Sequence, residues 1–477
     1  MAWRRATGFD AASSHVVRPS LPVQHTELPP AQPLVSNVAD VDIEGFQALL
    51  SPVGQAILAE AADADVSEDG LLATASRLRS RHPAGLVAAV LTQLRLRARA
   101  RDKFGPDAAR MYFTPAGLEQ STRSSVAAHR AHRFAAYLGG RFSPTRTCSS
   151  GQSDRPVLEL CSGIGADLIA RARAGCPGEG VDLDPLTVAV ARANIETLGL
   201  SDLVAVREGD AARQDPSGYA AVFADPGRRT ARGRVFDPKA YEPPLDVLLE
   251  LARRAPAACL KVAPGIPHEA IPAEAEAEWI SDRGEVKEAA LWLGGLSGSA
   301  GEGGPIRRRA TVLNPRDRGT ASKPACAGGA HGPGASATLV PEPGLGTPPV
   351  GPWLRYLYEP DGAVIRAHLV AEVAALTGGT LADPNIAYVT SDTLMATPFA
   401  SAYEIDDVLP FSLKKLRAEL RRRGVGILTI KKRGSAVDIE RLRRDLRLTG
   451  PNELTIVLTR IGEAPFVLLC RPAHVGH

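Results

Sequence analysis

Three acidic residues lie where short apolar segments end in the middle of the chain, and a glycine-rich turn follows the first. Glu159 lies in VLEL, Asp182 ends GVD and Asp210 ends VREGD. Gly163 and Gly165 in the turn let a ligand approach the backbone, and the helix that begins there has unpaired N–H groups. Open parallel sheets bind ligands beyond the carboxyl ends of their strands. The spacing therefore predicts a small-molecule site at that edge of a sheet.

Two ligands suit such a turn: a nicotinamide dinucleotide or S-adenosylmethionine (SAM). Leu168 occupies the third glycine position of the dinucleotide fingerprint, and the Glu159 carboxylate would repel a pyrophosphate but attract the cationic amino acid portion of SAM. Asp182 is placed to accept hydrogen bonds from both ribose hydroxyls, with Asp184 as a second candidate, and Asp210 to accept the adenine amino group. A single aspartate at a strand end is otherwise a helix cap or turn former, but the ordered set favours SAM as the cofactor.

These residues need a parallel sheet to position them. Strand-like and helical segments alternate from residue 157 to 265, which predicts an α/β sheet covered on both faces. VKEAALWL (286–293) and IRRRATVL (306–313) have no helix between them, so we expect a hairpin at the end of that sheet.

The rest of the chain divides by composition and periodicity. Apolar residues recur at helical spacing before the sheet, a stretch rich in Gly and Pro follows it, and a second strand–helix alternation comes last. We therefore predict a flexible leader (1–40), a helical N-terminal module (41–145), the cofactor domain (150–314), a linker (315–350) and a small C-terminal α+β domain (353–477).

Several strings resemble a known family. LELCSGIGADLIA, GVDLDPLTVAVARANIETLGL and VREGDA resemble class I SAM-dependent methyltransferases of the trimethylguanosine synthase-like and RNA methyltransferase groups. FADPGRRTARGRVFDPKAYEPP and LKVAPGI resemble bacterial methyltransferases with a C-terminal THUMP-like domain, and the likeness covers residues 41–314 and 353–477. The resemblance implies a Rossmann-like sheet, SAM as the cofactor and a THUMP-like domain at the C-terminus.

The string ADPGRR falls where the resembled amino-methylating enzymes hold the acceptor. Asp225 and Pro226 match the first two positions of their Asp/Asn-Pro-Pro-aromatic motif, and we predict them as catalytic or orienting residues. Gly227 and Arg228 depart from that motif, which leaves methylation of a base amine open. Arg228 and Arg229 have guanidinium groups that suit a phosphate. The alternatives are a solvated pair on a loop, or ion pairs with Asp225 or Asp237.

Three further parts of the sequence lie near the expected pocket: residues 111–123, Cys259 and Lys261. We expect MYFTPAGLEQSTR (111–123) to fold over the cleft, with Phe113 and Thr114 near the substrate. Cys259 lies within an apolar strand, which favours an inert buried thiol over a nucleophile. Lys261 either lines the pocket or packs beneath it.

Basic residues concentrate in the C-terminal domain. Between Phe411 and Arg447 there are thirteen Lys or Arg against four Asp or Glu, a local charge of +9. Such a segment either neutralises RNA phosphates or is a solvated helix face. If three elements converge on one surface, the residues that contact RNA are Arg421, Arg422, Arg423, Lys431 and Lys432.

Composition limits the alternatives. The net charge of the 477 residues is only +3, so a nucleic-acid signal has to be local. The six cysteines are scattered singly, which favours a reducing cytoplasm and no metal site, and no apolar stretch is long enough to cross a membrane. The oligomeric state is not predicted.

The sequence thus predicts a cytoplasmic SAM-dependent methyltransferase that acts on RNA, with tRNA or rRNA as the substrate and the C-terminal domain docking it. One alternative keeps the cofactor but has a protein or a small molecule as the acceptor. Another is a non-catalytic RNA-binding protein with a degenerate ADPGRR loop.

Overall fold

A computed structural model describes residues 42–139, 155–227, 229–230, 233–234, 241–298, 306–314 and 336–473. The predicted leader lies outside these ranges. The described residues form two compact units. The larger unit holds those between Pro29 and Ala277 and between Glu288 and Arg307, and the smaller unit holds those between Glu278 and Lys287 and after Arg308.

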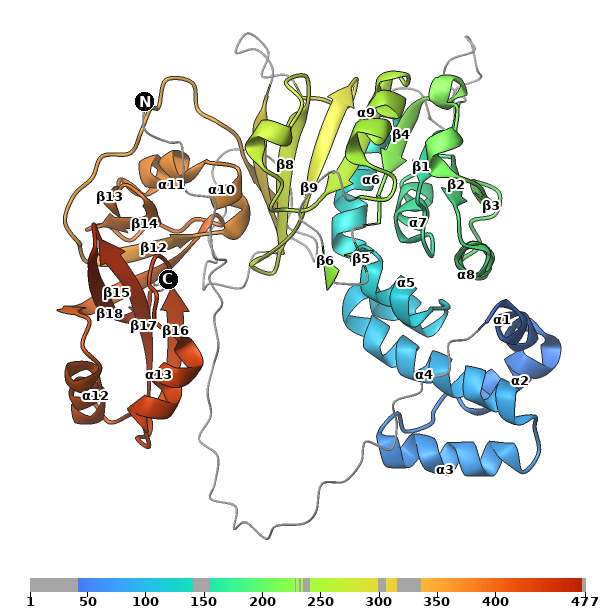
Figure 1. The fold of residues 1–477 in the computed structure, drawn as a ribbon, viewed down its shortest axis with the longest axis horizontal. Helices are drawn as coiled ribbons and strands as arrows, with labels where there is room; N and C mark the ends of the chain where they lie inside the picture. Colours follow the sequence, from blue (N-terminus) through green and yellow to red (C-terminus); the bar gives the residue numbers. More distant parts are fainter. Residues whose placement is uncertain are drawn as a thin grey trace. The chain divides into compact units, whose positions relative to one another are not determined.

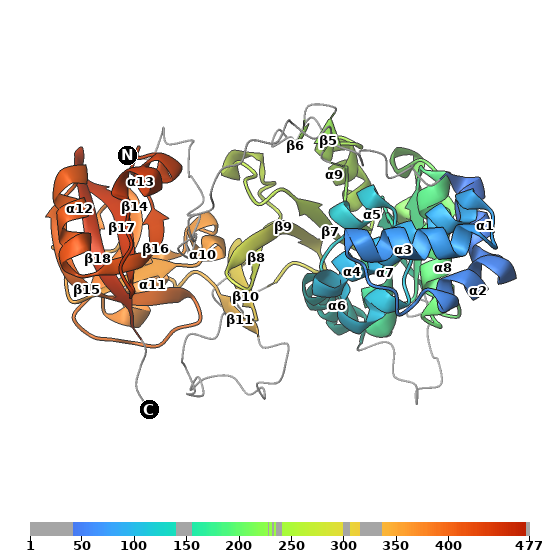
Figure 2. The same cartoon turned by 90° about the horizontal axis from the view of Figure 1, so that it is seen from below.

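The N-terminal module of the larger unit is helical, as predicted. One of its helices starts at a capped turn, since the Thr114 side chain accepts a hydrogen bond from the Gly117 N–H at 2.9 Å and Pro115 takes the first helical position. In Figures 1 and 2, α3 to α5 lie across one end of the parallel strands. The elements are α1 (Ile43–Leu50), α2 (Pro52–Glu60), α3 (Glu68–Arg79), α4 (Ala84–Phe104), η1 (Gly105–Ala109), α5 (Pro115–Gln120) and α6 (Ser124–Gly139).

The predicted parallel sheet follows this module. Strands β7, β4, β1, β2 and β3 lie side by side and parallel, and each residue of β1 is buried, as expected for a strand covered on both faces. The elements are β1 (Val157–Leu160), α7 (Ala166–Arg173), β2 (Gly178–Asp182), α8 (Pro185–Thr197), β3 (Val204–Glu208), η2 (Ala211–Arg213), η3 (Pro216–Gly218), β4 (Ala221–Ala224), α9 (Leu245–Arg253) and β7 (Ala257–Val262).

The order of the strands reverses between β1 and β4, because the chain continues from β1 outward through β2 and β3 and then returns to β4. Such a switch point opens a crevice at the carboxyl ends of the strands. The buried Asn194 on α8 joins the helical module to this edge: its side chain hydrogen-bonds the Tyr112 backbone and donates to the Ile164 carbonyl at 3.1 Å.

The hairpin predicted for residues 286–293 and 306–313 is wrong. Strand β8 (Glu276–Asp282) lies between β9 (Glu285–Gly294) and β10 (Arg308–Leu313) in the sheet, whose order is β11-β10-β8-β9-β7-β4-β1-β2-β3. Strand β8 is buried along its whole length, so its EAEWISD sequence shows no clean alternation that would mark it as a strand. Strand β11 (Ser336–Leu339) pairs with β10 inside the segment predicted as a linker. Residues 315–335 lie outside the described ranges.

The C-terminal α+β domain, in the smaller unit, has its own sheet, in the order β13-β14-β12-β15-β18-β17-β16. Between residues 362 and 377 the chain forms two short helices, since His368 has a φ of 57° and interrupts the helical backbone. The elements are β12 (Tyr356–Pro360), α10 (Gly362–Arg366), α11 (Val370–Thr377), β13 (Thr380–Asp383), β14 (Ile386–Ser391), β15 (Ala400–Pro410), α12 (Leu413–Arg422), β16 (Val425–Lys432), α13 (Ile439–Leu446), β17 (Asn452–Ile461) and β18 (Ala464–Pro472).

Candidate active site

A cleft opens at the carboxyl ends of the parallel strands, where the predicted cofactor residues meet. Its volume is ≈ 810 Å³, within the usual range for a small-molecule site. Helix α5 and the segment before it form one wall, and the turns after β1, β2, β3 and β4 form the others. The cleft is lined by the following predicted site residues: Thr114, Glu159, Gly163, Asp182, Asp184, Asp210, Asp225 and Pro226.

The glycine turn adopts the conformation that its sequence predicts. Gly163 and Gly165 have φ values of 54° and 84°, which glycine adopts without strain. The Gly163 N–H donates to Oδ2 of Asp182 at 2.8 Å, and the Asp184 N–H donates to Oδ1 at 3.1 Å. Because a carboxylate has about four lone-pair sites, Asp182 keeps the capacity to accept further hydrogen bonds. The turn and the carboxylate are therefore held together before any ligand binds.

Two of the predicted aspartates have structural partners. Asp184 caps α8, where its Oδ2 accepts from the Thr187 N–H at 2.8 Å. Asp210 caps the short helix η2, where its Oδ1 accepts from the Ala212 N–H at 2.9 Å. Both residues still line the cleft, so their contact with the cofactor remains a prediction beside an observed capping role.

The cleft is strongly acidic. Among the described residues that line it there is no Lys or Arg, and the acids are Glu119, Glu159, Asp167, Asp182, Asp184, Asp210, Asp225 and Glu242. A cavity with this lining attracts a cation and repels an anionic cofactor. SAM carries a sulfonium and an ammonium group, so the residues present fit it, whereas a dinucleotide pyrophosphate would meet several carboxylates and no Lys or Arg among the described lining residues.

Glu159 faces a cation that belongs to the chain itself. Its buried carboxylate pairs with the buried Arg171 of α7, and the guanidinium lies 5.5 Å and 4.9 Å from the ring centroids of Phe134 and Phe223. Burial raises the pKa of Glu159 to about 7, although Arg171 acts in the opposite direction. The sequence predicted the acid but not this partner.

A second buried arginine lies next to this pair. Arg130 of α6 contacts Asp167 at 2.7 Å and Glu288 of β9 at 3.1 Å, and all of these side chains are almost fully buried. Burial favours the neutral acid at Asp167, but Arg130 and Lys261 outweigh it and lower its pKa. At Glu288 burial outweighs the same cations and raises the pKa. Charged residues thus form a network directly beneath the cleft.

The segment predicted to hold the acceptor begins with a largely buried ion pair. The Lys261 ammonium lies 2.5 Å from Oδ2 of Asp225 and donates to the Thr122 hydroxyl at 2.8 Å. Beyond Pro226, Gly227 exchanges two backbone hydrogen bonds, of 2.9 Å and 3.0 Å, with Glu242. Arg228 lies outside the described residues. Arg229 begins the short strand β5 (Arg229–Thr230), which pairs with β6 (Gly233–Arg234), and its side chain is also outside the description.

The two residues predicted before α5 have different environments. Thr114 lines the cleft and caps α5. Phe113 packs in the core of the helical module, with its ring centroid 5.4 Å from that of Phe104, and does not line the cleft. The prediction of Phe113 as a substrate contact is therefore wrong. The buried Gln93 accounts for this position, since it hydrogen-bonds both backbone groups of Phe113 and turns the side chain into the module.

Neither thiol near the cleft is suited to act as a nucleophile. Cys259 is completely buried in β7. Cys161 lines the cleft, but burial and the surrounding carboxylates raise the pKa of its thiol. A thiolate is required for nucleophilic attack, so a mechanism that begins with cysteine attack has no support here.

The basic residues of the C-terminal domain do not share one surface. Arg421 and Arg422 are exposed at the end of α12, where Arg422 pairs with Glu419 at 2.5 Å, and the half-buried Arg423 pairs with Glu419, Asp406 and Asp407.

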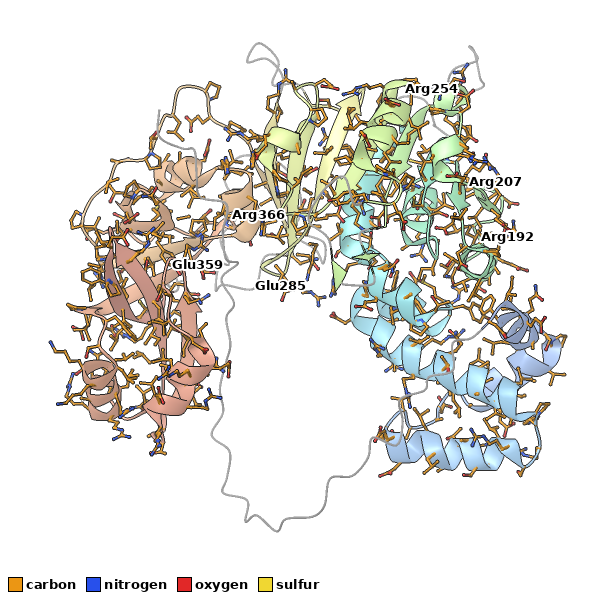
Figure 3. The ribbon with its side chains drawn as sticks, viewed as in Figure 1. Arg192, Arg207, Arg254, Glu285, Glu359 and Arg366 are labelled. Carbon is orange, nitrogen blue, oxygen red and sulfur yellow. The ribbon has the colours of Figure 1, made fainter. Side chains whose placement is uncertain are left out.

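The two lysines at the end of strand β16 also have partners within the domain. Lys431 is mostly buried and lies 2.5 Å from Glu359 of β12, labelled in Figure 3, and Lys432 is half-buried and donates to the Val437 carbonyl at 3.4 Å. The expectation that Arg423 and Lys431 belong to a free basic surface is wrong, because acids of α12 and β15 pair with Arg423 and an acid of β12 pairs with Lys431.

The sequence did not reveal the ion-pair partners Arg130, Arg171 and Glu288. It also did not reveal the contact between Lys261 and Asp225. One signal existed, because Arg130 lies among Ala127, Ala131 and Phe134 on the buried face of α6. An arginine on an apolar helix face implies a buried acid, but the sequence does not say which one.

The described part of the chain has neither a membrane-spanning helix nor a metal-binding cluster. None of its helices is long and apolar enough to span a bilayer. Within the same ranges, no three His, Cys, Asp or Glu side chains cluster as metal ligands would.

Comparison with known proteins agrees with this geometry. Residues 400–472 match the family model described as THUMP domain-like, and residues 42–100 match a domain of unknown function, DUF8688. A protein described as an uncharacterised SAM-dependent methyltransferase, found in Mycobacterium tuberculosis strains H37Rv and CDC 1551, is 34% identical over 394 residues, which span 79% of this chain and 95% of the relative.

Among solved structures, a candidate methyltransferase of Porphyromonas gingivalis W83 covers 86% of this chain and 99% of its own length, with a TM-score of 0.60 and 20% identity. The fold and the cleft define a class I methyltransferase. Given the mycobacterial relative, the chain belongs to the family of SAM-dependent methyltransferases, and its C-terminal domain is THUMP-like. The predictions of fold class, enzyme class, cofactor and family are thereby confirmed.

Proposed function

We propose that this enzyme transfers the methyl group of SAM to RNA, with tRNA or rRNA as the acceptor. The observation that carries the proposal is the pair of basic helices α12 and α13 in the THUMP-like domain. Their apolar residues pack inward on the sheet, and their outward positions carry these exposed basic side chains: Lys414, Lys415, Arg421, Arg422, Arg441 and Arg444. Exposed cations on adjacent helices suit a phosphate backbone, which they hold without reading sequence.

The cleft supplies the other half of the proposal. Asp182 would hold the ribose of SAM, Asp210 the adenine, and the acidic lining would favour the cationic end of the cofactor. SAM supplies an activated methyl group, so the protein mainly has to align donor and acceptor. Asp225 and Pro226, at the end of β4, would face the acceptor. Arg228 and Arg229 remain proposed phosphate contacts.

Fractionation of acceptors from a strain that lacks the gene tests this proposal. RNA, protein and metabolite fractions are incubated with the enzyme and methyl-labelled SAM. We expect label in RNA, and mass spectrometry of the digested nucleosides would identify the modified atom. Asp225→Ala is the matched variant and should abolish the labelling while SAM binding persists. Label confined to protein or metabolites would instead establish a different acceptor.

A further inference from the structure

Lys261 is a buried lysine that contacts Asp225, the acid proposed above to face the acceptor. It lies on β7, whose residue Leu260 is in register with Ala224 of the parallel strand β4. The next residues along the two strands are Lys261 and Asp225. The side chain of Lys261 is 5% exposed and that of Asp225 is 20% exposed, so the lysine lies beneath the cleft and the aspartate opens into it.

The contact fixes the orientation of the carboxylate. Lys261 binds Oδ2 of Asp225, and among the described residues no donor is bonded to Oδ1. A second contact, to the Thr122 hydroxyl in the turn between α5 and α6, also anchors the ammonium. Thr122 also accepts from Arg130 at 3.2 Å, which connects the lysine to the buried network. A carboxylate held at one oxygen presents the other in a defined direction.

We propose that Lys261 is a positioning residue of the acceptor site, which holds Oδ2 of Asp225 and turns Oδ1 toward the acceptor, so that the acceptor presents an N–H or O–H group. An ionised carboxylate only accepts hydrogen bonds, and therefore selects an acceptor that donates one. A carbon acceptor without such a hydrogen would leave the oxygen unpaired in a partly buried site. This inference rests on the role proposed above for Asp225.

Methyl transfer makes one bond and breaks another. The acceptor nitrogen or oxygen forms a bond to the methyl carbon while the carbon–sulfur bond breaks, and the electron pair of that bond stays on sulfur. The proton of the acceptor passes to Oδ1 of Asp225 and from there to solvent. Lys261 takes no part in bond making, and acts by holding the carboxylate that receives the proton.

A double-mutant cycle tests the inference. Lys261→Met, Asp225→Asn and the double variant are compared for kcat and KM with labelled SAM and whichever fraction of the deletion strain the wild type methylates. We expect Lys261→Met to lower kcat by about 100-fold with little change in the KM for SAM, since misorientation of a catalytic group costs about that much. In the Asp225→Asn background the same substitution should cost less than about twofold, because the two residues act as a unit.

Matched controls distinguish a misoriented Asp225 carboxylate from a loss of protein stability. Lys287→Met removes a strand lysine that pairs with Glu285, away from the cleft, and should leave kcat unchanged. SAM affinity measured by calorimetry shows whether each variant keeps a folded cleft. If Lys261→Met does not bind SAM, Lys261→Gln replaces it in the cycle, because glutamine keeps a hydrogen-bond donor but removes the charge. Lys261→Arg should recover part of the activity.

The outcomes are distinct. Full activity of Lys261→Met, or an equal loss with and without Asp225, would overturn the role of Lys261 and leave the proposed function intact. Full activity of Asp225→Asn would overturn the role of Asp225 and the inference that depends on it. A wild type that labels only protein or metabolites would contradict RNA methylation, and the cycle would then be run with that fraction.

Discussion

The cofactor cleft and the outer faces of α12 and α13 both depend on charged side chains, but they hold them in opposite ways. The side chains of Glu159 and Asp167 are only 2% and 7% exposed, and each pairs with a buried arginine. Those of Arg422 and Arg441 are 69% and 78% exposed. A buried charge needs its partner, whereas an exposed one is stabilised by water. Substitutions in the cleft should therefore affect folding and cofactor binding, and those on the helices should affect only ligand affinity.

The largest effect is expected from Arg171→Met. The substitution leaves Glu159 buried without its cation and should lower the free energy of unfolding by about 3 to 5 kcal/mol at pH 8. Arg207→Met is the matched control, because Arg207 pairs with Glu179 at the surface of β3 (Figure 3) and should contribute less than about 1 kcal/mol. Urea unfolding measures both variants. Equal losses would show that burial does not distinguish the two ion pairs.

Asp182→Ala tests the cleft as a cofactor site. Loss of two hydrogen bonds from the ribose to a carboxylate, each contributing about 1.5 to 3 kcal/mol, should weaken SAM binding by at least about 100-fold in calorimetry. Asp184→Ala removes the α8 cap instead, and should lower the free energy of unfolding by about 1 kcal/mol with a smaller change in affinity. If the two variants bind SAM equally, the ribose is not held by Asp182.

These two aspartates also show what the sequence could predict. The order of apolar segments, glycines and acids predicted the sheet, the turn and the cleft residues, because that pattern is local to each strand and the turn after it. The role of Asp184 as a cap was an open alternative, and the structure shows the capping hydrogen bond.

Residues whose roles depend on distant partners could not be predicted. Glu159 looked available for a ligand because Arg171 is twelve residues away on the next helix. Lys431 looked exposed because its partner Glu359 lies 72 residues earlier on another strand of the same sheet. Strand β8 was missed because a fully buried strand lacks alternation.

Glu159→Gln should reveal the pH dependence of the buried pair. Burial raises the pKa of Glu159 from 4.5 to about 7, so the folded protein binds this proton more tightly than the unfolded chain does. Its contribution to stability is therefore fully present below about pH 4.5 and is lost as the pH rises through 7, by up to roughly 3 kcal/mol. Thermal unfolding of the wild type and the variant from pH 5 to 8 measures the change in their difference.

Glu179→Gln is the control for this titration. Burial opposes ionisation of Glu179, but hydrogen bonds from Tyr219 and Arg207 outweigh it and lower its pKa. Its contribution to stability is present above the unfolded value and is lost only as the pH falls through the lower folded value, so its difference from the wild type should stay flat from pH 5 to 8. A flat difference for Glu159→Gln as well would mean that Arg171 keeps Glu159 ionised throughout.

The double variant Lys414→Glu, Lys415→Glu reverses two exposed charges on α12. We expect it to have the smallest effect on the free energy of unfolding. Unfolding should change by less than about 0.5 kcal/mol, because the substituted side chains are solvated. Affinity for RNA from the deletion strain should nevertheless fall, and the slope of log affinity against log salt should decrease by about 0.7 for each lost contact with a single-stranded phosphate backbone.

Arg254→Glu, an exposed substitution beyond α9 (Figure 3), is the control for nonspecific charge effects. Arg254→Glu changes the net charge by half as much as the α12 variant does, so a loss of RNA affinity about half as large, on a logarithmic scale, would mean that net charge rather than the α12 surface governs binding. If neither loses affinity, the THUMP-like domain does not dock RNA through these helices. Unchanged SAM affinity in the α12 variant would show that the basic helices and the acidic cleft act on different ligands, since a change of charge at one then leaves the cofactor bound at the other.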